Sequence, residues 1–303
     1  MSLAITAGVD GSPAGLAAAD WAAREARLRG LPLVLVHVHD WQPRAYTYAP
    51  LAGGIAPLDA GTQAHWAERT LRDAATDLGR RHPGLEISTR HLGGEPAAVL
   101  AATAQESELL VLGSRGLGPV TGFLVGSVAS ATVARAARPV VLVRAGGTEG
   151  DPTSGRSDAA ASRDVVLGLD LTRPSEELVS FAFEAASLRR VPLRVVHGWN
   201  LPPAYGYDAG AAYAELQKEI AVTEAGALAQ ALLGWREKYP SVAVSEHSLL
   251  GGAVPLLLDA AADACLVVVG RRIRRSAAGM HVGPVAHAML HHCAVPVAVV
   301  PHA

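Results

Sequence analysis

The sequence predicts an α/β protein of two tandem doubly wound domains, each a five-stranded parallel sheet flanked by helices. One ordered series of sequence landmarks occurs twice, and within each copy short aliphatic runs alternate with helical patterns. Continuous runs of Val, Leu and Ile are typical of parallel strands that helices cover on both faces. A length of 303 residues also fits two domains.

The two copies are offset by roughly 160 residues, which indicates a tandem pair of domains rather than a solenoid of short repeats. We expect domains at 1–145 and 164–303. The segment 146–163 is rich in Gly, Ser, Asp and Ala without apolar periodicity, and we expect it to be a linker. The matching landmarks are Val9-Asp10 and Leu169-Asp170, 32–37 and 192–197, Gly93-Gly94 and Gly251-Gly252, 109–113 and 266–270, Gly126 and Gly283, and 139–141 and 296–298.

Each element of the first copy has a local signal. Ser12-Pro13 supplies an N-cap and a proline at the first helical position, so the first helix begins there and runs to Arg29. The third strand is shorter than its neighbours and is expected nearer an edge. We expect strands at 3–9, 33–38, 86–91, 109–112 and 140–143, and further helices at 62–81, 96–105 and 127–137.

Composition excludes several classes of function. Half of the residues are apolar, 18% are charged and the formal net charge is −2, so we expect no nucleic-acid partner. The apolar runs are too short to span a bilayer and the first residues lack signal-peptide features, so we expect no membrane association and a cytoplasmic location. Two cysteines, Cys265 and Cys293, do not make a disulfide framework.

Catalytic and metal motifs are missing from the sequence. Neither Lys218 nor Lys238 follows a glycine loop, and no nucleophile–base set or carboxylate pair stands out, so we assign no catalytic residue. His287 and His291 have the i, i+4 spacing of a metal-binding pair. No carboxylate or cysteine at motif spacing completes such a site, and cationic side chains near a helix C-terminus are the ordinary alternative, so we assign no metal site.

The strongest site signal is the glycine-rich stretch 113–127 after the fourth strand. In doubly wound sheets, ligands bind beyond the carboxyl ends of the strands, which also selects 8–12 and 38–40. Gly126-Ser127 opens a helix, whose free N–H groups can hold a polyphosphate without any lysine. The Ser127 hydroxyl is placed either to cap this helix or to touch a phosphate, and Arg115 adds a charge-assisted contact. A glycine-rich loop without a ligand is the plain alternative.

These residues carry a resemblance to a known family. The stretch contains Gly113-x-x-Gly116 followed, after nine residues, by Gly126-Ser127. This spacing resembles the nucleotide motif of the universal stress protein family. Asp10 at the end of the first strand, His37-Val38 at the end of the second and the helix start at 94–96 also match. The resemblance covers the chain apart from the linker, and it implies an adenine nucleotide alpha hydrolase-like fold.

The resemblance implies ATP as the ligand, alone or with Mg²⁺, and a nucleotide-dependent regulatory module in stress adaptation. It places Asp10 at the adenine and ribose, the backbone of Val38 at the adenine edge, and the helix start at the phosphates. For Asp10 alone, a turn or helix-cap aspartate is the alternative. The implied cofactor-binding residues are Gly8, Val9, Asp10, Val38, Leu112, Gly113, Arg115, Gly116, Gly126, Ser127 and Val128.

The second copy departs from this motif. Ile273 stands at the second glycine and Pro284 at the serine, although the spacing is intact. Isoleucine adds bulk where a phosphate would approach, and proline removes an N–H and the hydroxyl. We expect the second copy to bind ATP much more weakly than the first, or not at all. The arginines at 271, 272, 274 and 275 are expected in a solvated loop.

Two other functions stay open at this point. A slow ATPase or nucleotide-transfer enzyme is one, since phosphoryl transfer depends mainly on positioning. A scaffold that acts without nucleotide is the other. In the family the fifth strand pairs two domains, so the resemblance implies pairing of 140–143 with 297–300 within the chain, and a homodimer is a further option. The sequence does not identify a regulatory protein partner.

Overall fold

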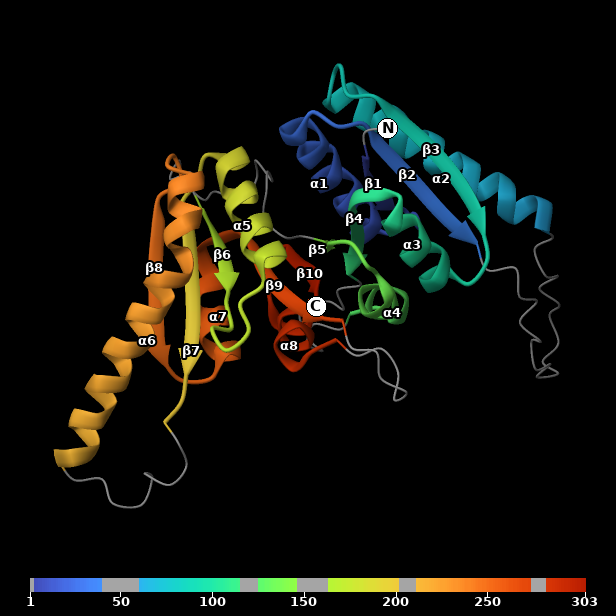
Figure 1. Cartoon of the computed structure of the whole chain (residues 1–303). Helices are drawn as coiled ribbons and strands as arrows, with labels where there is room; N and C mark the ends of the chain where they lie inside the picture. Colours follow the sequence, from blue (N-terminus) through green and yellow to red (C-terminus); the bar gives the residue numbers. More distant parts are fainter. Residues whose placement is uncertain (1–2, 40–59, 115–124, 146–162, 202–210, 274–281) are drawn as a thin grey trace, which may run out of the picture. The chain divides into compact units, whose positions relative to one another are not determined.

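The computed structural model describes residues 3–39, 60–114, 125–145, 163–201, 211–273 and 282–303 (Figure 1). The contacts group the described residues of Met1–Gly116 and Gly126–Ala145 into one compact unit, and those of Gly146–Ala303 into a second. Among the described helices, none is both long enough and apolar enough to cross a membrane.

The first unit is a parallel sheet with the strand order β3-β2-β1-β4-β5. The order reverses direction between β1 and β4, as a doubly wound fold requires. The predicted α/β class is therefore confirmed. Along the chain the elements are β1 (Ala4–Gly8), α1 (Pro13–Arg29), β2 (Leu33–His39), α2 (Ala60–Arg81), β3 (Ile87–Gly93), α3 (Pro96–Gln105), β4 (Ser107–Ser114), α4 (Ser127–Arg135) and β5 (Val140–Arg144).

The second unit repeats this topology with the order β10-β9-β6-β7-β8. Its β9 and β6 occupy the places of β4 and β1, so the switch point is repeated as well. The elements are β6 (Asp164–Gly168), α5 (Glu176–Arg189), β7 (Leu193–Trp199), α6 (Ala211–Lys238), β8 (Val244–Leu250), α7 (Ala253–Ala260), the 3₁₀ turn η2 (Ala261–Asp263), β9 (Ala264–Arg272), α8 (Pro284–His292) and β10 (Val297–His302).

Element ends differ from the predicted ones by a few residues. The predicted strand 109–112 extends over Ser107–Ser114, because Ser107 pairs with Ala4 and Ser114 pairs with Arg144. The predicted helix 127–137 ends earlier, at Arg135, since Ala136 already has an extended conformation. Pairing with neighbouring strands sets the ends of β4, and the hydropathy of the strand itself does not predict them.

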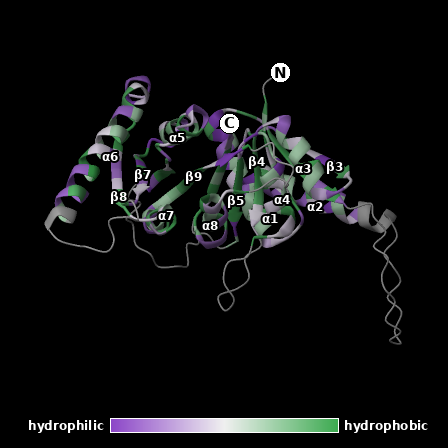
Figure 2. Cartoon of the chain, turned by 60° about the horizontal axis from the view of Figure 1, so that its bottom comes forward, coloured by the Kyte–Doolittle hydropathy of each residue, from purple (hydrophilic) through white to green (hydrophobic). Residues whose placement is uncertain are grey.

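The sheet core consists of aliphatic side chains from the central strands. Ile5, Leu33, Leu109 and Leu110 are fully buried. In each unit, right-handed crossovers place the first two helices on one face of the sheet and the last two on the other. The central strands are hydrophobic along their length, whereas α6 mixes hydrophobic and hydrophilic positions (Figure 2).

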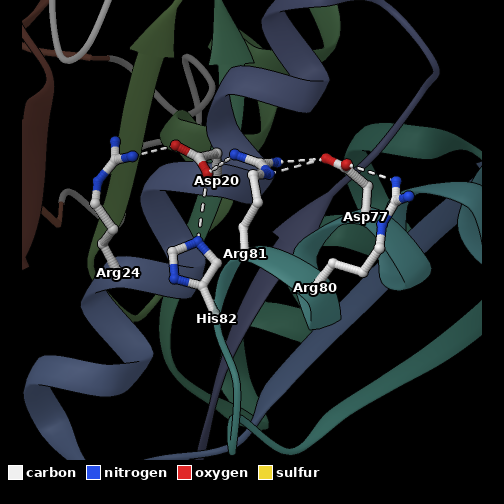
Figure 3. A network of polar contacts seen from close by, with 6 residues as sticks. All are labelled: Asp20, Arg24, Asp77, Arg80, Arg81 and His82. Carbon is white, nitrogen blue, oxygen red and sulfur yellow. Dashed lines mark hydrogen bonds and ion pairs between the residues drawn. The ribbon is translucent and has the colours of Figure 1, made fainter.

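A polar network joins the two helices that cover one face of the first sheet (Figure 3). Asp20 on α1 accepts hydrogen bonds from Arg24 and Arg81, and its carboxylate lies 3.4 Å from Nε2 of His82. Asp77 on α2 binds Arg81 at 2.7 Å, and the hydrogen bonds from Arg81 hold the pKa of Asp77 below its ordinary value. Asp20 is thus the shared acceptor between α1 and the end of α2.

Replacing Asp20 with alanine is expected to lower the stability of the folded chain by about 1 kcal/mol, because cations from two helices lose one partly exposed acceptor. Urea unfolding followed by circular dichroism measures the effect. Asp73→Ala is the matched control: Asp73 lies on α2, where it faces Arg69 at 3.8 Å and both side chains are largely exposed. An equal loss of folding stability in the two variants would contradict the stabilising role assigned to Asp20.

Candidate functional site

A cavity of about 430 Å³ lies at the carboxyl ends of β1 and β4, where the strand order of the first unit reverses. Polar groups come from the end of β1 and the helix starts, and apolar walls come from β2, α3 and β4. The lining residues are Gly8, Val9, Asp10, Ser12, Gly15, Val36, Val38, Pro96, Leu100, Leu112, Gly113, Gly126, Ser127, Val128 and Ala129.

Every predicted site residue that the structure describes lies in this lining. Arg115 and Gly116 fall outside the described residues. The sequence reasoning missed several lining residues, although two carried a usable signal. Val36 is two positions before Val38 on the same face of β2, and Leu100 is one helical turn after Pro96 at the start of α3. The other lining residues that were not predicted as ligand-binding are Ser12, Gly15, Pro96 and Ala129.

The start of α4 forms the polar end of the cavity. Gly126 is its N-cap, in an extended conformation with φ −63° and ψ 149°, and no side chain caps the helix. Of the two alternatives for the Ser127 hydroxyl, capping of this helix is therefore wrong, because Ser127 is already the first helical residue. Ser127, Val128 and Ala129 line the cavity with the helix end that carries free N–H groups and partial positive charge.

Asp10 shapes the turn that leads from β1 into α1. Its Oδ1 accepts hydrogen bonds from the backbone N–H of Ser12 at 3.0 Å and from the Ser12 hydroxyl at 2.5 Å. The Ser12 hydroxyl oxygen in turn accepts the N–H of Gly15 at 3.1 Å and so caps α1. Asp10 therefore has the structural role of a turn aspartate, and it also lines the cavity.

Two glycines allow this corner to pack closely. A Cβ on Gly15 would lie 2.5 Å from Oδ1 of Asp10. A Cβ on Gly113 would lie 2.5 Å from the carbonyl carbon of Ala14 and 2.7 Å from the nitrogen of Gly15. The first glycine of the motif therefore lets the first turn of α1 rest on β4, whether or not a ligand is bound.

The backbone of Val38 faces the cavity side of β2. The N–H of Val9 donates to the carbonyl of Val36 at 2.8 Å, and the N–H of Gly94 donates to the carbonyl of His39 at 3.0 Å. Successive residues of a strand direct their backbone groups to opposite neighbours. The groups of Val38 therefore point toward β1, beyond the residue where β1 ends. They offer one donor and one acceptor next to the apolar wall.

An imidazole cluster lies on the α2 side of the same sheet. His37 is buried and its Nδ1 lies 2.8 Å from the carbonyl oxygen of Val9, so it fastens the end of β1 to β2. The ring of Trp66 meets His37 edge-on at 5.7 Å, and the ring of His91 lies 4.5 Å from that of His39. Burial lowers the pKa of His91, and the neighbouring His39 and His37 lower it further.

The second unit repeats the turn but not the helix start. Oδ1 of Asp170 accepts the N–H and the hydroxyl of Thr172 at 3.0 and 2.7 Å, as Asp10 does with Ser12. Ser175 stands at the position of Gly15 and caps α5, which begins only at Glu176. The side chain of His302 lies beside Gly270, and a Cβ added to Gly270 would be 2.7 Å from Nε2 of His302.

The wall formed by Val38 is also different in the second unit. Gly198 stands at that position, and a Cβ there would lie 2.8 Å from the carbonyl oxygen of Gly251 and 3.2 Å from Cα of Ala253. The start of α7 therefore packs directly on β7 at the position that Val38 occupies in the first unit.

The arginine cluster of the second unit is only partly solvated. Arg271 is buried, at 5% exposure, and burial lowers its pKa. The expectation of a solvated loop is wrong for Arg271, because the residue belongs to β9 at the position of the buried Ser114. Arg272 is exposed, and residues 274 and 275 lie outside the described residues.

Comparisons with known proteins agree on one family. The model of the universal stress protein family matches residues 1–144 and 162–301. A universal stress protein of Mycobacterium tuberculosis is 33% identical over 305 residues, which is 97% of this chain and 96% of that protein. One from Mycolicibacterium smegmatis is 32% identical over 302 residues, with 98% and 96% covered. The crystal structure of a universal stress protein from Archaeoglobus fulgidus, 16% identical, shares the fold with a TM-score of 0.67 over 99% of this chain and 98% of that chain.

The lowered pKa of His91 predicts a loss of stability in acid. The folded chain binds a proton on His91 less readily than the unfolded chain does, so unfolding is favoured as the pH falls below the ordinary histidine pKa of 6.5. In His91→Gln, the stability lost between about pH 7 and pH 5 should be smaller than in the unmodified chain. Chemical unfolding at both pH values measures the difference.

His65→Gln is the control for this experiment, because His65 lies exposed on α2. It should leave the pH dependence unchanged. If His91→Gln loses as much stability on acidification as the unmodified chain, the imidazole cluster does not carry the effect.

Proposed function

Because the chain belongs to the universal stress protein family, we propose that its first unit binds one ATP in the cavity between β1 and β4 and acts as a nucleotide-dependent regulatory module in stress adaptation. One observation carries the proposal: the start of α4, which has no side-chain cap, and an apolar wall line the same cavity at the switch point of the sheet. A volume of about 430 Å³ lies within the range of small-molecule sites.

The apolar wall suits the adenine ring. Val36, Val38, Leu100 and Leu112 line the cavity on the side of β2, α3 and β4. The backbone carbonyl of Val38 can accept the exocyclic amino group of adenine, and its N–H can donate to a ring nitrogen. A guanine would present a carbonyl oxygen to that carbonyl, so the arrangement favours adenine over guanine.

The opposite end of the cavity suits the phosphates. The first N–H groups of α4 and the positive end of its dipole replace the lysine that phosphate loops use. The Ser127 hydroxyl is free of a capping role and is a further donor toward a phosphate oxygen. Arg115 and Gly116, in the preceding segment, would complete the phosphate contacts that the family motif implies.

Asp10 would accept a ribose hydroxyl, because a carboxylate at the end of a strand is a strong acceptor for such groups. It is the only carboxylate among the described residues that line the cavity. A single carboxylate makes a poor cage for Mg²⁺, which prefers phosphate oxygens and water. Mg²⁺ would therefore enter bound to the phosphates of ATP rather than occupy a separate protein site.

We expect no nucleotide in the second unit. Ile273 and Pro284 alter the phosphate end, His302 lies beside Gly270, and α7 packs on β7 at Gly198. These differences alter the phosphate end and the wall beside β7, although the aspartate turn is kept. The expected stoichiometry is therefore one ATP for each chain.

Ser127→Pro tests the phosphate end by giving the first unit the residue of the second. Proline is well tolerated at the first position of a helix, and Gly126 already has the extended conformation that a following proline requires. The variant should fold normally and yet lose one N–H and the hydroxyl. We expect its affinity for ATP to fall by about tenfold or more, the range for losing a charge-assisted hydrogen bond.

Isothermal titration of the full chain with ATP and Mg²⁺ measures this affinity. The reciprocal variant Pro284→Ser is the control, and it should neither add a second site nor change the first. The proposal fails if Ser127→Pro binds ATP as tightly as the unmodified chain while both unfold at the same temperature. Two ATP molecules bound to the unmodified chain would refute the assignment of the second unit.

A further inference from the structure

The helix α8 of the second unit carries three histidines that the nucleotide site does not use. His287 and His291 are one helical turn apart, and their rings stack with centroids 4.4 Å apart and planes inclined by 28°. His292, on the same last turns, lies 6.5 Å from the ring of His291 with its plane turned by 53°. Two of the three imidazoles therefore form a pair.

The spacing of this pair fits a shared metal ion. An imidazole nitrogen binds a divalent transition metal at about 2.1 Å, so two imidazoles at right angles on one ion have ring centroids about 4.5 Å apart. The observed separation of 4.4 Å is close to this value, but the ring planes are inclined by only 28°, so the rings must turn before both nitrogens face one ion. Because residues at i and i+4 project from the same side of a helix, rotations about the side-chain bonds suffice to turn both nitrogens toward one ion.

The pair is also accessible to solvent. His287 is exposed and His291 is half-exposed. Within the part of the chain that the structure describes, the His287 side chain has no hydrogen bond or ion pair, and its one ring contact is with His291. A metal ion would therefore not have to displace an existing partner of His287.

We propose that His287 and His291 bind a divalent transition-metal ion that prefers imidazole, such as Cu²⁺, Ni²⁺ or Zn²⁺, with water at the remaining positions. The described residues contain no group of three or more His, Cys, Asp or Glu arranged to hold a metal. The site is thus a two-ligand chelate, which exchanges its metal more readily than a closed structural site.

The site belongs to the second unit alone. The corresponding residues of α4 are Ser130 and Ala134, which cannot form the chelate. A metal that links two successive turns stabilises the folded helix, since the unfolded chain does not hold the two imidazoles together. Metal binding is therefore expected to raise the unfolding temperature and to weaken in acid, where protons compete for both imidazoles.

Titration of the full chain, without an affinity tag, with NiCl₂ and separately with CuCl₂ and ZnCl₂ tests the proposal by calorimetry. The unmodified chain should bind one ion at this site, with Cu²⁺ the tightest of the three. His287→Ala should weaken that binding by about tenfold or more, because a single imidazole remains. It should also abolish the rise in unfolding temperature with Ni²⁺.

His292→Ala is the matched control, since it removes an exposed histidine from the same turn and leaves both imidazoles of the stacked pair in place. It should bind each metal within about twofold of the unmodified chain. His291→Ala should behave like His287→Ala, with circular dichroism confirming that both variants fold. Equal losses in His287→Ala and His292→Ala, or no saturable binding by the unmodified chain, would overturn the proposal. None of these outcomes depends on whether the first unit binds ATP.

Discussion

The close contact between the first turn of α1 and β4 is the constraint on which the first unit's cavity depends. Gly113 has no Cβ, so the backbone of Ala14 and Gly15 can rest directly on the strand. That position brings the turn at Asp10 to the switch point of the sheet, opposite the start of α4. Any side chain at 113 would push α1 away and separate the two polar ends that the cavity combines.

The second unit has the same fold, but its first helix does not make this close backbone contact with the corresponding strand, β9. Gly270 is present, but Ser175 replaces Gly15 and α5 begins only at Glu176. A side chain at the position of Gly15 would meet the aspartate of the turn, so the helix starts beyond it. The imidazole of His302 then lies beside Gly270. The helix start and the surroundings of Gly270 thus differ from those of the first unit while the strand order stays the same.

The sequence predicted the fold and the cavity lining well, because both follow from local signals. Aliphatic runs marked the strands, Asp10 and Gly113 marked the strand ends, and Gly126 marked the helix start that lines the cavity. Contacts between residues far apart in the chain were not predictable. The burial of Arg271 and the approach of α7 to Gly198 depend on how distant elements pack, which neither periodicity nor a motif encodes.

The cavity also differs from a lysine-based phosphate site in the kind of substitution that would destroy it. Its polar groups are largely backbone groups: the N–H groups at the start of α4 and both groups of Val38. Side-chain changes at these positions leave such groups in place, whereas proline removes one and a residue larger than glycine displaces the strand or helix that holds them. The second unit differs at positions of this kind, with Ile273, Pro284 and Ser175. The same physical argument underlies the proposal that a nearly neutral chain with two lysines holds a polyphosphate in its first unit and not in its second.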